Sequence, residues 1–186
     1  MKKQPISYDE YKEEIMRIYR DLRREGYYYN LLINLFEECI TKDMKVIPVY
    51  LNTGYKDDGK KRLHDRLQYA DSHSLQDIII VPHHYTYENT TKPYVSIEIK
   101  KPNFLQGGDY RPVDIKKYDD QLYAEFHYCK YIIFTDCISW YFLEESKKTN
   151  NPDIYLYDDI GWKKDVIEWE KLKLTISEFI KGSVNY

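Results

Sequence analysis

Two short runs of β-branched residues lie close together near the middle of the sequence and limit what the chain can fold into. They are DIIIV, residues 77–81, and YVSIEIK, residues 94–100. Both have the length and composition of buried strands, and the connection between them is polar and contains prolines. We therefore expect a long β-hairpin. Such a hairpin needs further strands or a helix to cover its apolar face.

The flanking sequence supplies candidates for both kinds of element. Apolar residues recur at helical spacing in four stretches, which are residues 8–24, 29–40, 113–129 and 165–182. Gly26 and Gly182 are the expected stops of the first and last of these helices. Strand-like runs occupy residues 45–51, 131–135, 138–144 and 153–158, and a short helix is expected within residues 60–70. Pro48 places the first of these strands at a sheet edge or a bulge. The order of elements predicts an α/β or α+β domain with one mixed central sheet flanked by helices.

Length and composition narrow the classes of protein to consider. The 186 residues are expected to form one domain, with a helical N-terminal part over 8–41, a core over about 45–145 and a C-terminal helix over about 166–181. The net charge of −3 gives no overall basic signature of a nucleic-acid binder, although a local basic patch is compatible with it. The first residues lack the apolar core of a signal peptide, and no segment reaches ~18 uninterrupted apolar residues. We therefore expect a cytoplasmic protein that does not bind a membrane.

The charged residues of the second run are the most informative feature for function. Alternate residues of a strand share a face, so Glu98 and Lys100 lie side by side about 7 Å apart, while Val95, Ile97 and Ile99 point into the core. Burying either charge without a partner costs several kcal/mol. The arrangement therefore needs a physical reason.

A metal ion is one such reason. Pairing within the hairpin can bring Asp77, at the head of the first run, next to Glu98. Two carboxylates held close together repel each other unless a cation lies between them, and a small number of hard oxygen ligands suits Mg²⁺ or Mn²⁺. Lys100 beside that cation can orient or deprotonate an attacking water and stabilise developing negative charge. The pattern favours a phosphodiester-cleaving site.

A surface ion pair is the alternative. On a solvent-facing strand, Glu98 and Lys100 would form a neighbouring pair that contributes about 0–1 kcal/mol. Glu-x-Lys alone is compatible with either interpretation.

The combination of Asp77, a hairpin and Glu98-x-Lys100 resembles the core motif of the PD-(D/E)XK nuclease superfamily. The segment KKYDDQLYAEFHYCKYIIFTDCISWYFLEE, residues 116–145, is similar to the one that follows this motif in the nuclease domains of type I restriction subunits and single-chain restriction–modification enzymes. The resemblance covers roughly residues 75–145. It implies a restriction-endonuclease-like fold and a divalent ion, Mg²⁺ or Mn²⁺.

The resemblance also implies roles for individual residues. Asp77 and Glu98 would hold the metal with help from the Ile99 carbonyl, and Lys100 would serve the attacking water. Gln121 would support the site or contact the DNA backbone.

The sequence departs from the family pattern at three positions. Gln76 stands where Pro is common before Asp77, Glu125 stands four residues after Gln121 where some branches have Tyr, and Cys137 follows Asp136 where Gly, Asn or Tyr is more usual. None of these changes removes a metal ligand.

The family commonly has an acidic residue on an early helix facing the site. Glu37 and Glu38 are the candidates here, and we favour Glu37 as part of a second metal site or as a residue that orients water. A solvated helix face is an equally good interpretation of both.

Other polar residues have ordinary explanations. His83 and His84 are interpreted as hairpin-loop residues rather than transition-metal ligands. The basic residues of segment 56–66 could contact phosphates or lie on a solvated loop and helix.

The expected function is a metal-dependent endonuclease of the restriction or defence type that cleaves DNA. Other restriction–modification domains or subunits are expected partners, and a homodimer would be needed for a double-strand cut with one site per chain. Two alternatives stay open. One is a catalytically silent nuclease-fold binding module, which binds DNA or protein as a phage or mobile-element factor. The other is an RNA nuclease on the same scaffold.

Overall fold

The structure, a computed structural model, describes eight segments of the chain. They are residues 5–22, 25–49, 76–86, 92–105, 108–145, 149–158, 161–163 and 166–184. The helix expected within 60–70 and the basic residues of segment 56–66 lie outside these ranges.

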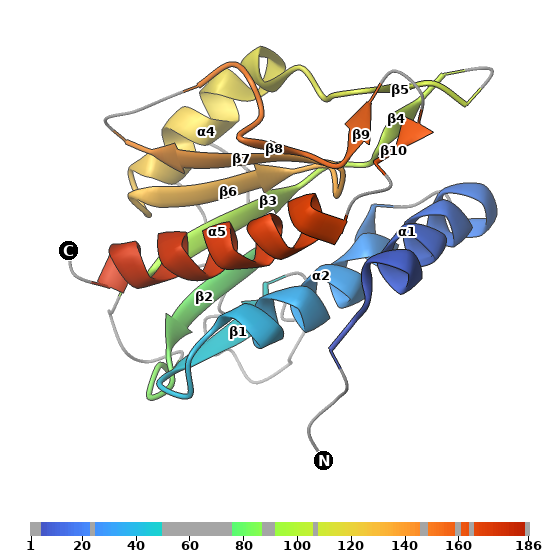
Figure 1. The fold of residues 1–186 in the computed structure, drawn as a ribbon. Coiled ribbons are helices and arrows are strands. Elements are labelled where there is room, and N and C mark those ends of the chain that lie inside the picture. Colours follow the sequence, from blue (N-terminus) through green and yellow to red (C-terminus); the bar gives the residue numbers. More distant parts are fainter. Residues whose placement is uncertain are drawn as a thin grey trace, which may run out of the picture.

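A mixed sheet of six strands and four α-helices make up most of the described residues (Figure 1). The helices are α1 (Tyr8–Arg17), α2 (Gly26–Cys39), α4 (Asp119–Phe126) and α5 (Val166–Val184). The strands, in spatial order, are β1 (Met44–Pro48), β2 (Ile78–Pro82), β3 (Val95–Ile99), β6 (Tyr131–Thr135), β7 (Ser139–Glu144) and β8 (Ile154–Tyr155). The expected mixed α/β architecture is confirmed.

Strand pairing follows the sequence pattern closely. β2 and β3 form the expected antiparallel hairpin, and β6 and β7 form a second one. β1 lies at the edge of the sheet, as Pro48 indicated, because a proline lacks the N–H that an inner strand needs. β3 pairs with β6 in parallel, and α4 lies in the crossover between these two strands. The described residues also form two small antiparallel sheets of two strands each. One pairs β4 (Asn103–Phe104) with β5 (Tyr110–Arg111), and the other pairs β9 (Tyr157–Asp158) with β10 (Gly161–Trp162).

Helices cover both faces of the sheet. α2 and α5 lie side by side on one face with α1 next to them, and their apolar residues pack on Val95, Ile97 and Ile99 of β3 (Figure 1). α4 covers the opposite face over β6 and β7, where Leu122 and Phe126 belong to a separate core cluster. β3 is therefore buried on both sides, which makes any charged residue on it expensive unless it has partners.

Three expected elements differ in detail. The first helix ends at Arg17 and continues as a π-helical segment, Ile18–Leu22. The prediction that Gly26 ends this helix is wrong, because Gly26 is the first residue of α2. α4 is preceded by a 3₁₀ turn, Ile115–Tyr118, because the Asp114 side chain accepts a hydrogen bond from the Lys116 N–H and tightens the chain there. The run 153–158 divides into β8 and β9, which belong to different sheets.

The prediction that Gly182 ends the last helix is wrong. α5 continues to Val184, and the Ser183 hydroxyl donates to the Ile180 carbonyl at 2.7 Å within the last turn. A helical glycine costs only about 1 kcal/mol relative to alanine, which the buried face of α5 outweighs.

Membrane insertion through a helix has no support in the described ranges. None of their helices combines the length and the apolar character that crossing a bilayer requires.

Candidate active site

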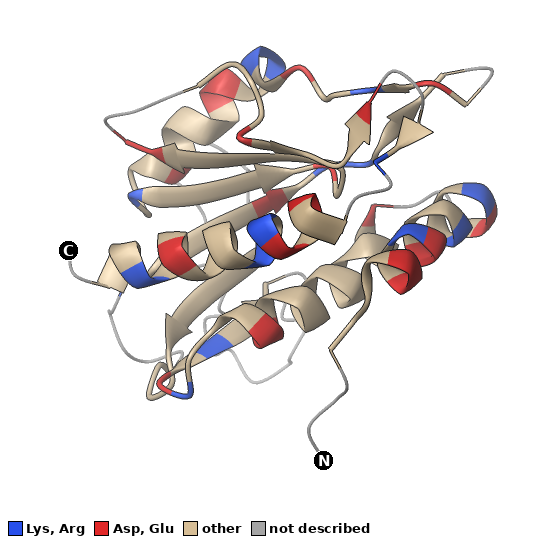
Figure 2. Cartoon of the chain, in the orientation of Figure 1, with Lys and Arg blue, Asp and Glu red and all other residues tan. Residues whose placement is uncertain are grey.

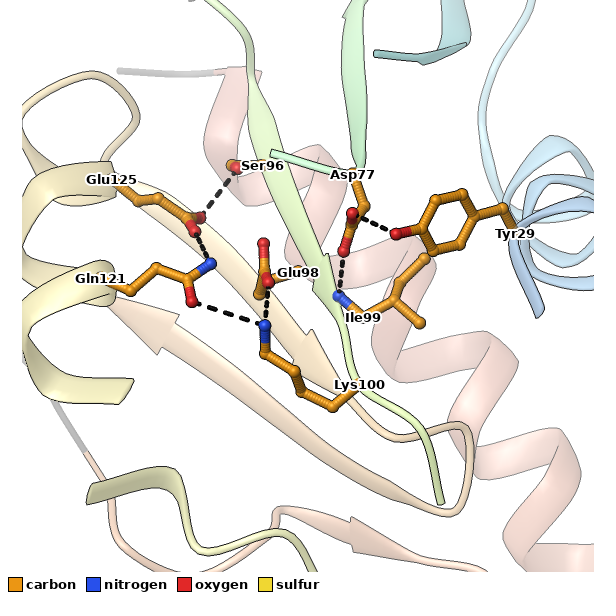
Figure 3. Close-up of polar contacts among 8 residues, drawn as sticks. All are labelled: Tyr29, Asp77, Ser96, Glu98, Ile99, Lys100, Gln121 and Glu125. Carbon is orange, nitrogen blue, oxygen red and sulfur yellow. Dashed lines mark hydrogen bonds and ion pairs between the residues drawn. The ribbon is translucent and has the colours of Figure 1, made fainter. Parts of the chain in front are cut away.

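The polar residues of β3 lie on the face that α4 covers (Figure 3). Glu98 is only 3 % exposed, and Ser96 is completely buried. The alternative of a solvent-facing ion pair is therefore wrong. The expected alternation is confirmed on the other face, where Val95, Ile97 and Ile99 lie in the main core.

Asp77 lies just before the start of β2, against the backbone of β3. Its Oδ2 accepts a hydrogen bond from the Ile99 N–H at 2.8 Å, and its Oδ1 accepts one from the Tyr29 hydroxyl of α2. The Asp77 N–H in turn donates to the Ile97 carbonyl at 3.2 Å. The hairpin thus brings Asp77 to the neighbourhood of Glu98, and Tyr29 fixes the carboxylate from a third element.

The Ile99 carbonyl belongs to the same side of β3 as Asp77. In an extended strand the N–H and C=O of one residue point to the same neighbour. The Ile99 N–H donates to Asp77, whereas the Lys100 N–H donates to the Thr135 carbonyl of β6 at 2.8 Å. The Ile99 carbonyl oxygen is therefore directed toward the Asp77 side, where a cation shared with the carboxylates would lie.

Lys100 curls back over Glu98. Its ammonium forms an ion pair with Glu98 Oε1 and donates to Gln121 Oε1 at 3.4 Å (Figure 3). The centre of the Tyr118 ring lies 4.6 Å from Nζ. Desolvation acts to lower the pKa of Lys100, but the charges of Glu98, Glu25 and Asp77 outweigh it and raise this pKa above its ordinary value. Lys100 is thus held as an ammonium ion whose side chain is 16 % exposed.

The carboxyl groups of the cluster resist ionisation together. Burial raises the pKa of Glu98 well above its ordinary value, and the charges of Asp77 and Glu125 raise it further. Burial also raises the pKa of Asp77, although the bonds from Tyr29 and Ile99 act against this. One oxygen of Glu98, Oε2, is buried without a hydrogen-bond donor among the described residues. A cation bound here would give this buried oxygen a partner and would reduce the repulsion between Glu98 and the neighbouring carboxyl of Asp77.

The donor set fits a small hard cation. Mg²⁺ typically takes one or two carboxylates and keeps water or phosphate oxygens in its remaining positions, which matches Asp77, Glu98 and the Ile99 carbonyl. Groups of three or more His, Cys, Asp or Glu side chains arranged to hold a metal are not found in the described ranges. A site for a transition metal with several protein ligands therefore has no support there, and His83 and His84 lie exposed on the turn after β2.

The structure places the early acidic residue differently from our expectation. Glu37 is exposed and lines a groove between α2 and α5, as does Glu38, whose Oε1 accepts the Ile6 N–H at 2.7 Å. Tyr29 contacts Asp77, and a residue eight positions further along a helix lies about 12 Å away along its axis, which takes Glu37 away from the cluster. Glu25, just before α2, is half-buried and interacts electrostatically with Lys100 and Asp77.

Sequence reasoning also missed Tyr29 and Glu125. Gln121 was expected at the site and is there, and Glu125 lies one helical turn further along α4 with its carboxyl directed to the same cluster. The i, i+4 spacing of Gln121 and Glu125 is a signal that could have found the second residue.

Comparisons with known proteins add no family. No model of a protein family, no curated protein and no solved structure matches this chain. The resemblance to the PD-(D/E)XK superfamily thus rests on the motif residues themselves.

Proposed function

We propose that this protein is a divalent-metal-dependent phosphodiesterase that cleaves DNA, an endonuclease of the restriction or defence type. The observation that carries the proposal is a pair of neighbouring carboxyl groups, buried Glu98 on β3 and half-buried Asp77 just before β2, with the Lys100 ammonium bound to Glu98. Isolated buried carboxylates are costly, so a cluster of them on a rigid sheet is better explained by chemistry than by stability.

Asp77, Glu98 and the Ile99 carbonyl would hold Mg²⁺ or Mn²⁺. When bound, such an ion polarises a phosphate and lowers the pKa of a coordinated water. Asp77 supplies a carboxylate whose orientation is fixed by Tyr29 and the Ile99 N–H. Glu98 supplies the orphan oxygen Oε2.

Lys100 acts as a positive hydrogen-bond donor at the attacked phosphate. Its raised pKa favours the charged form, which can orient an attacking water and stabilise the negative charge that develops on the phosphate oxygens. Gln121 accepts a hydrogen bond from this ammonium and restricts its position.

DNA would contact the exposed end of the cluster. Residues of both charge signs are interspersed along the described elements in the view of Figure 2, and the net charge of the chain is −3. Lys101, Lys116 and Lys117 are exposed basic residues near the site in sequence, and they are candidates for phosphate contacts. Further restriction–modification subunits and a second copy of the chain belong to the same proposal.

A silent binding module is the second candidate. An acidic net charge is its main support, whereas buried Glu98 with half-buried Asp77 and Lys100 speaks against it, because a non-catalytic core is more stable without such charged groups. An RNA nuclease is the third, and contacts to a 2′-hydroxyl would distinguish it from a DNA nuclease.

The test combines cleavage with metal binding. Supercoiled plasmid and a matched single-stranded RNA are incubated with the wild type, Glu98→Gln, Lys100→Met and, as a control, Glu37→Gln, each with Mg²⁺, Mn²⁺ or EDTA. We expect nicking by the wild type and the control with either ion, none with EDTA, and a loss of at least about 100-fold in the two site variants. In parallel, Mn²⁺ should raise the melting temperature of the wild type but not of Glu98→Gln.

The outcomes separate the candidates. Absence of nicking with an intact Mn²⁺ effect would indicate a cleavage site that needs partner subunits. Absence of both would refute the metal site and leave the binding module. Cleavage of RNA alone would establish the third candidate.

A further inference from the structure

Glu125 is a completely buried carboxyl that the proposed chemistry does not use. It lies on the inner face of α4, and its two oxygens accept hydrogen bonds from two different elements. Gln121 Nε2 donates to Oε1 at 3.1 Å, and the Ser96 hydroxyl of β3 donates to Oε2 at 3.2 Å. The carboxyl thus joins the helix to the strand that carries Glu98.

The bond from Gln121 to Glu125 fixes which way the Gln121 amide points. The amide has a donor end and an acceptor end, and a lysine ammonium offers donors only, whereas a carboxylate accepts. In the observed orientation the amide oxygen faces Lys100 and the amide nitrogen faces Glu125. A flipped amide would place NH₂ against the ammonium and oxygen against the carboxyl, so both contacts would become repulsive.

The backbone geometry supports this chain of contacts. Gln121 and Glu125 are four residues apart on one helix and lie on the same face. Ser96, Glu98 and Lys100 share one face of β3. The two faces meet, so that hydrogen bonds run without a break from Ser96 through Glu125 and Gln121 to Lys100 and on to Glu98 (Figure 3).

We propose that Glu125 is a positioning residue that fixes the orientation of the Gln121 amide and, through it, the place of the Lys100 ammonium over Glu98. Glu125 does not touch the substrate, because its side chain is enclosed between α4 and β3. The functional part of this inference rests on the proposed nuclease activity, whereas the structural part concerns the Gln121 amide alone.

Three variants separate positioning from charge and from packing. Glu125→Gln keeps an oxygen that can accept from Gln121 and an NH₂ that can donate to the Ser96 hydroxyl, but it removes the charge. Glu125→Leu fills a similar volume without any acceptor. Asp120→Asn removes an exposed carboxylate from the same helix and serves as the control.

Two measurements are made on each protein. The first is the exchange of the Gln121 side-chain amide hydrogens with solvent, followed by NMR on glutamine-labelled protein and assigned by its loss in Gln121→Met. The second is the Mg²⁺-dependent nicking of plasmid, resolved into kcat and KM.

We expect the amide exchange to accelerate about tenfold in Glu125→Leu and to stay near the wild-type rate in Glu125→Gln and in the control. We also expect kcat to fall about tenfold in Glu125→Leu with KM unchanged, and to recover largely in Glu125→Gln. Unchanged amide exchange in Glu125→Leu would overturn the proposal, and so would an equal loss of kcat in Glu125→Leu and Glu125→Gln. The amide measurement needs no activity, so it decides the structural part even if the wild type proves not to be a nuclease.

Discussion

The turn between β6 and β7 contains an aspartate whose protonation should govern part of the pH dependence of stability. Asp136 is completely buried. Its Oδ1 accepts from the N–H groups of Ile138 at 3.1 Å and Ser139 at 2.7 Å, and its Oδ2 accepts from the Val113 N–H at 3.2 Å and from the Tyr110 hydroxyl. Burial raises the pKa of Asp136 from 3.8 to about 6, and these hydrogen bonds keep it from rising further.

The sign of the effect follows from the direction of the pKa change. The folded state binds the Asp136 proton more tightly than the unfolded state, so this residue favours folding fully only below about pH 3.8, and the benefit is lost as the pH rises through about 6. At 1.36 kcal/mol per pKa unit, a pKa change from 3.8 to about 6 corresponds to roughly 3 kcal/mol in the free energy of unfolding.

The assay compares wild type with Asp136→Asn by urea unfolding between pH 4 and pH 7.5. The variant cannot ionise, but it loses the acceptor for the Val113 N–H, which costs about 1–3 kcal/mol at every pH. We expect the wild type to be the more stable protein at pH 4 and its advantage to shrink by roughly 2.5 kcal/mol by pH 7.5. Other buried carboxyls titrate in both proteins and cancel in the difference.

A difference between the two proteins that stays constant over this range would refute the reasoning. Tyr110→Phe provides a second check. It removes a donor that favours the ionised form, so the pKa of Asp136 should rise further and the loss of stability should extend above pH 6.

Three further predictions concern other parts of the molecule. Tyr29→Phe removes a hydrogen-bond donor from Asp77 and raises the pKa of that carboxyl. The Mn²⁺ concentration at half-saturation, measured by calorimetry at pH 6, should therefore be about tenfold higher than for the wild type, and this difference should be smaller at pH 8. Equal values for the two proteins would contradict the role of this contact. Glu25→Gln should lower plasmid nicking about fivefold whereas Glu37→Gln leaves it unchanged, because only the former faces the cluster; the opposite order would restore the original expectation. Cys137 has φ of 72°, so Cys137→Gly should be about 1 kcal/mol more stable to denaturant than Cys137→Ala, and equal stabilities would show that the turn carries no strain.

The sheet was largely predictable because its strands carry local signals. The β-branched runs of β2 and β3 and the aromatic runs of β6 and β7 correspond to the expected hairpins. The alternation of side chains in a strand then placed Glu98 and Lys100 on one face and brought Asp77 near them. These predictions depend only on residues close in sequence and on the alternation of side chains along a strand.

The contributions from other elements were not predictable in the same way. Tyr29 and Glu25 reach the cluster because the start of α2 lies against the start of β2, a tertiary arrangement that helical spacing does not encode. The spacing of Glu125 from Gln121 places both on one helix face, but the contact of Glu125 with Ser96 of β3 is tertiary and is not encoded in that spacing. Helix ends were uncertain for the same reason, since packing of α5 overrides the local signal of Gly182.

The parallel pairing of β3 with β6 has a consequence for how the protein folds. Ser96 pairs with Ile132, 36 positions away in the chain, whereas the β2–β3 and β6–β7 hairpins join residues as close as Ile80 with Val95 and Thr135 with Trp140. Closing a long loop costs more entropy than closing a short one, and non-local pairs form slowly. The two hairpins can therefore form before β3 pairs with β6. We expect the polar face of β3 to stay hydrated until that pairing is complete. We therefore expect the carboxyl cluster to become buried late in folding, after the apolar contacts of the two hairpins have formed.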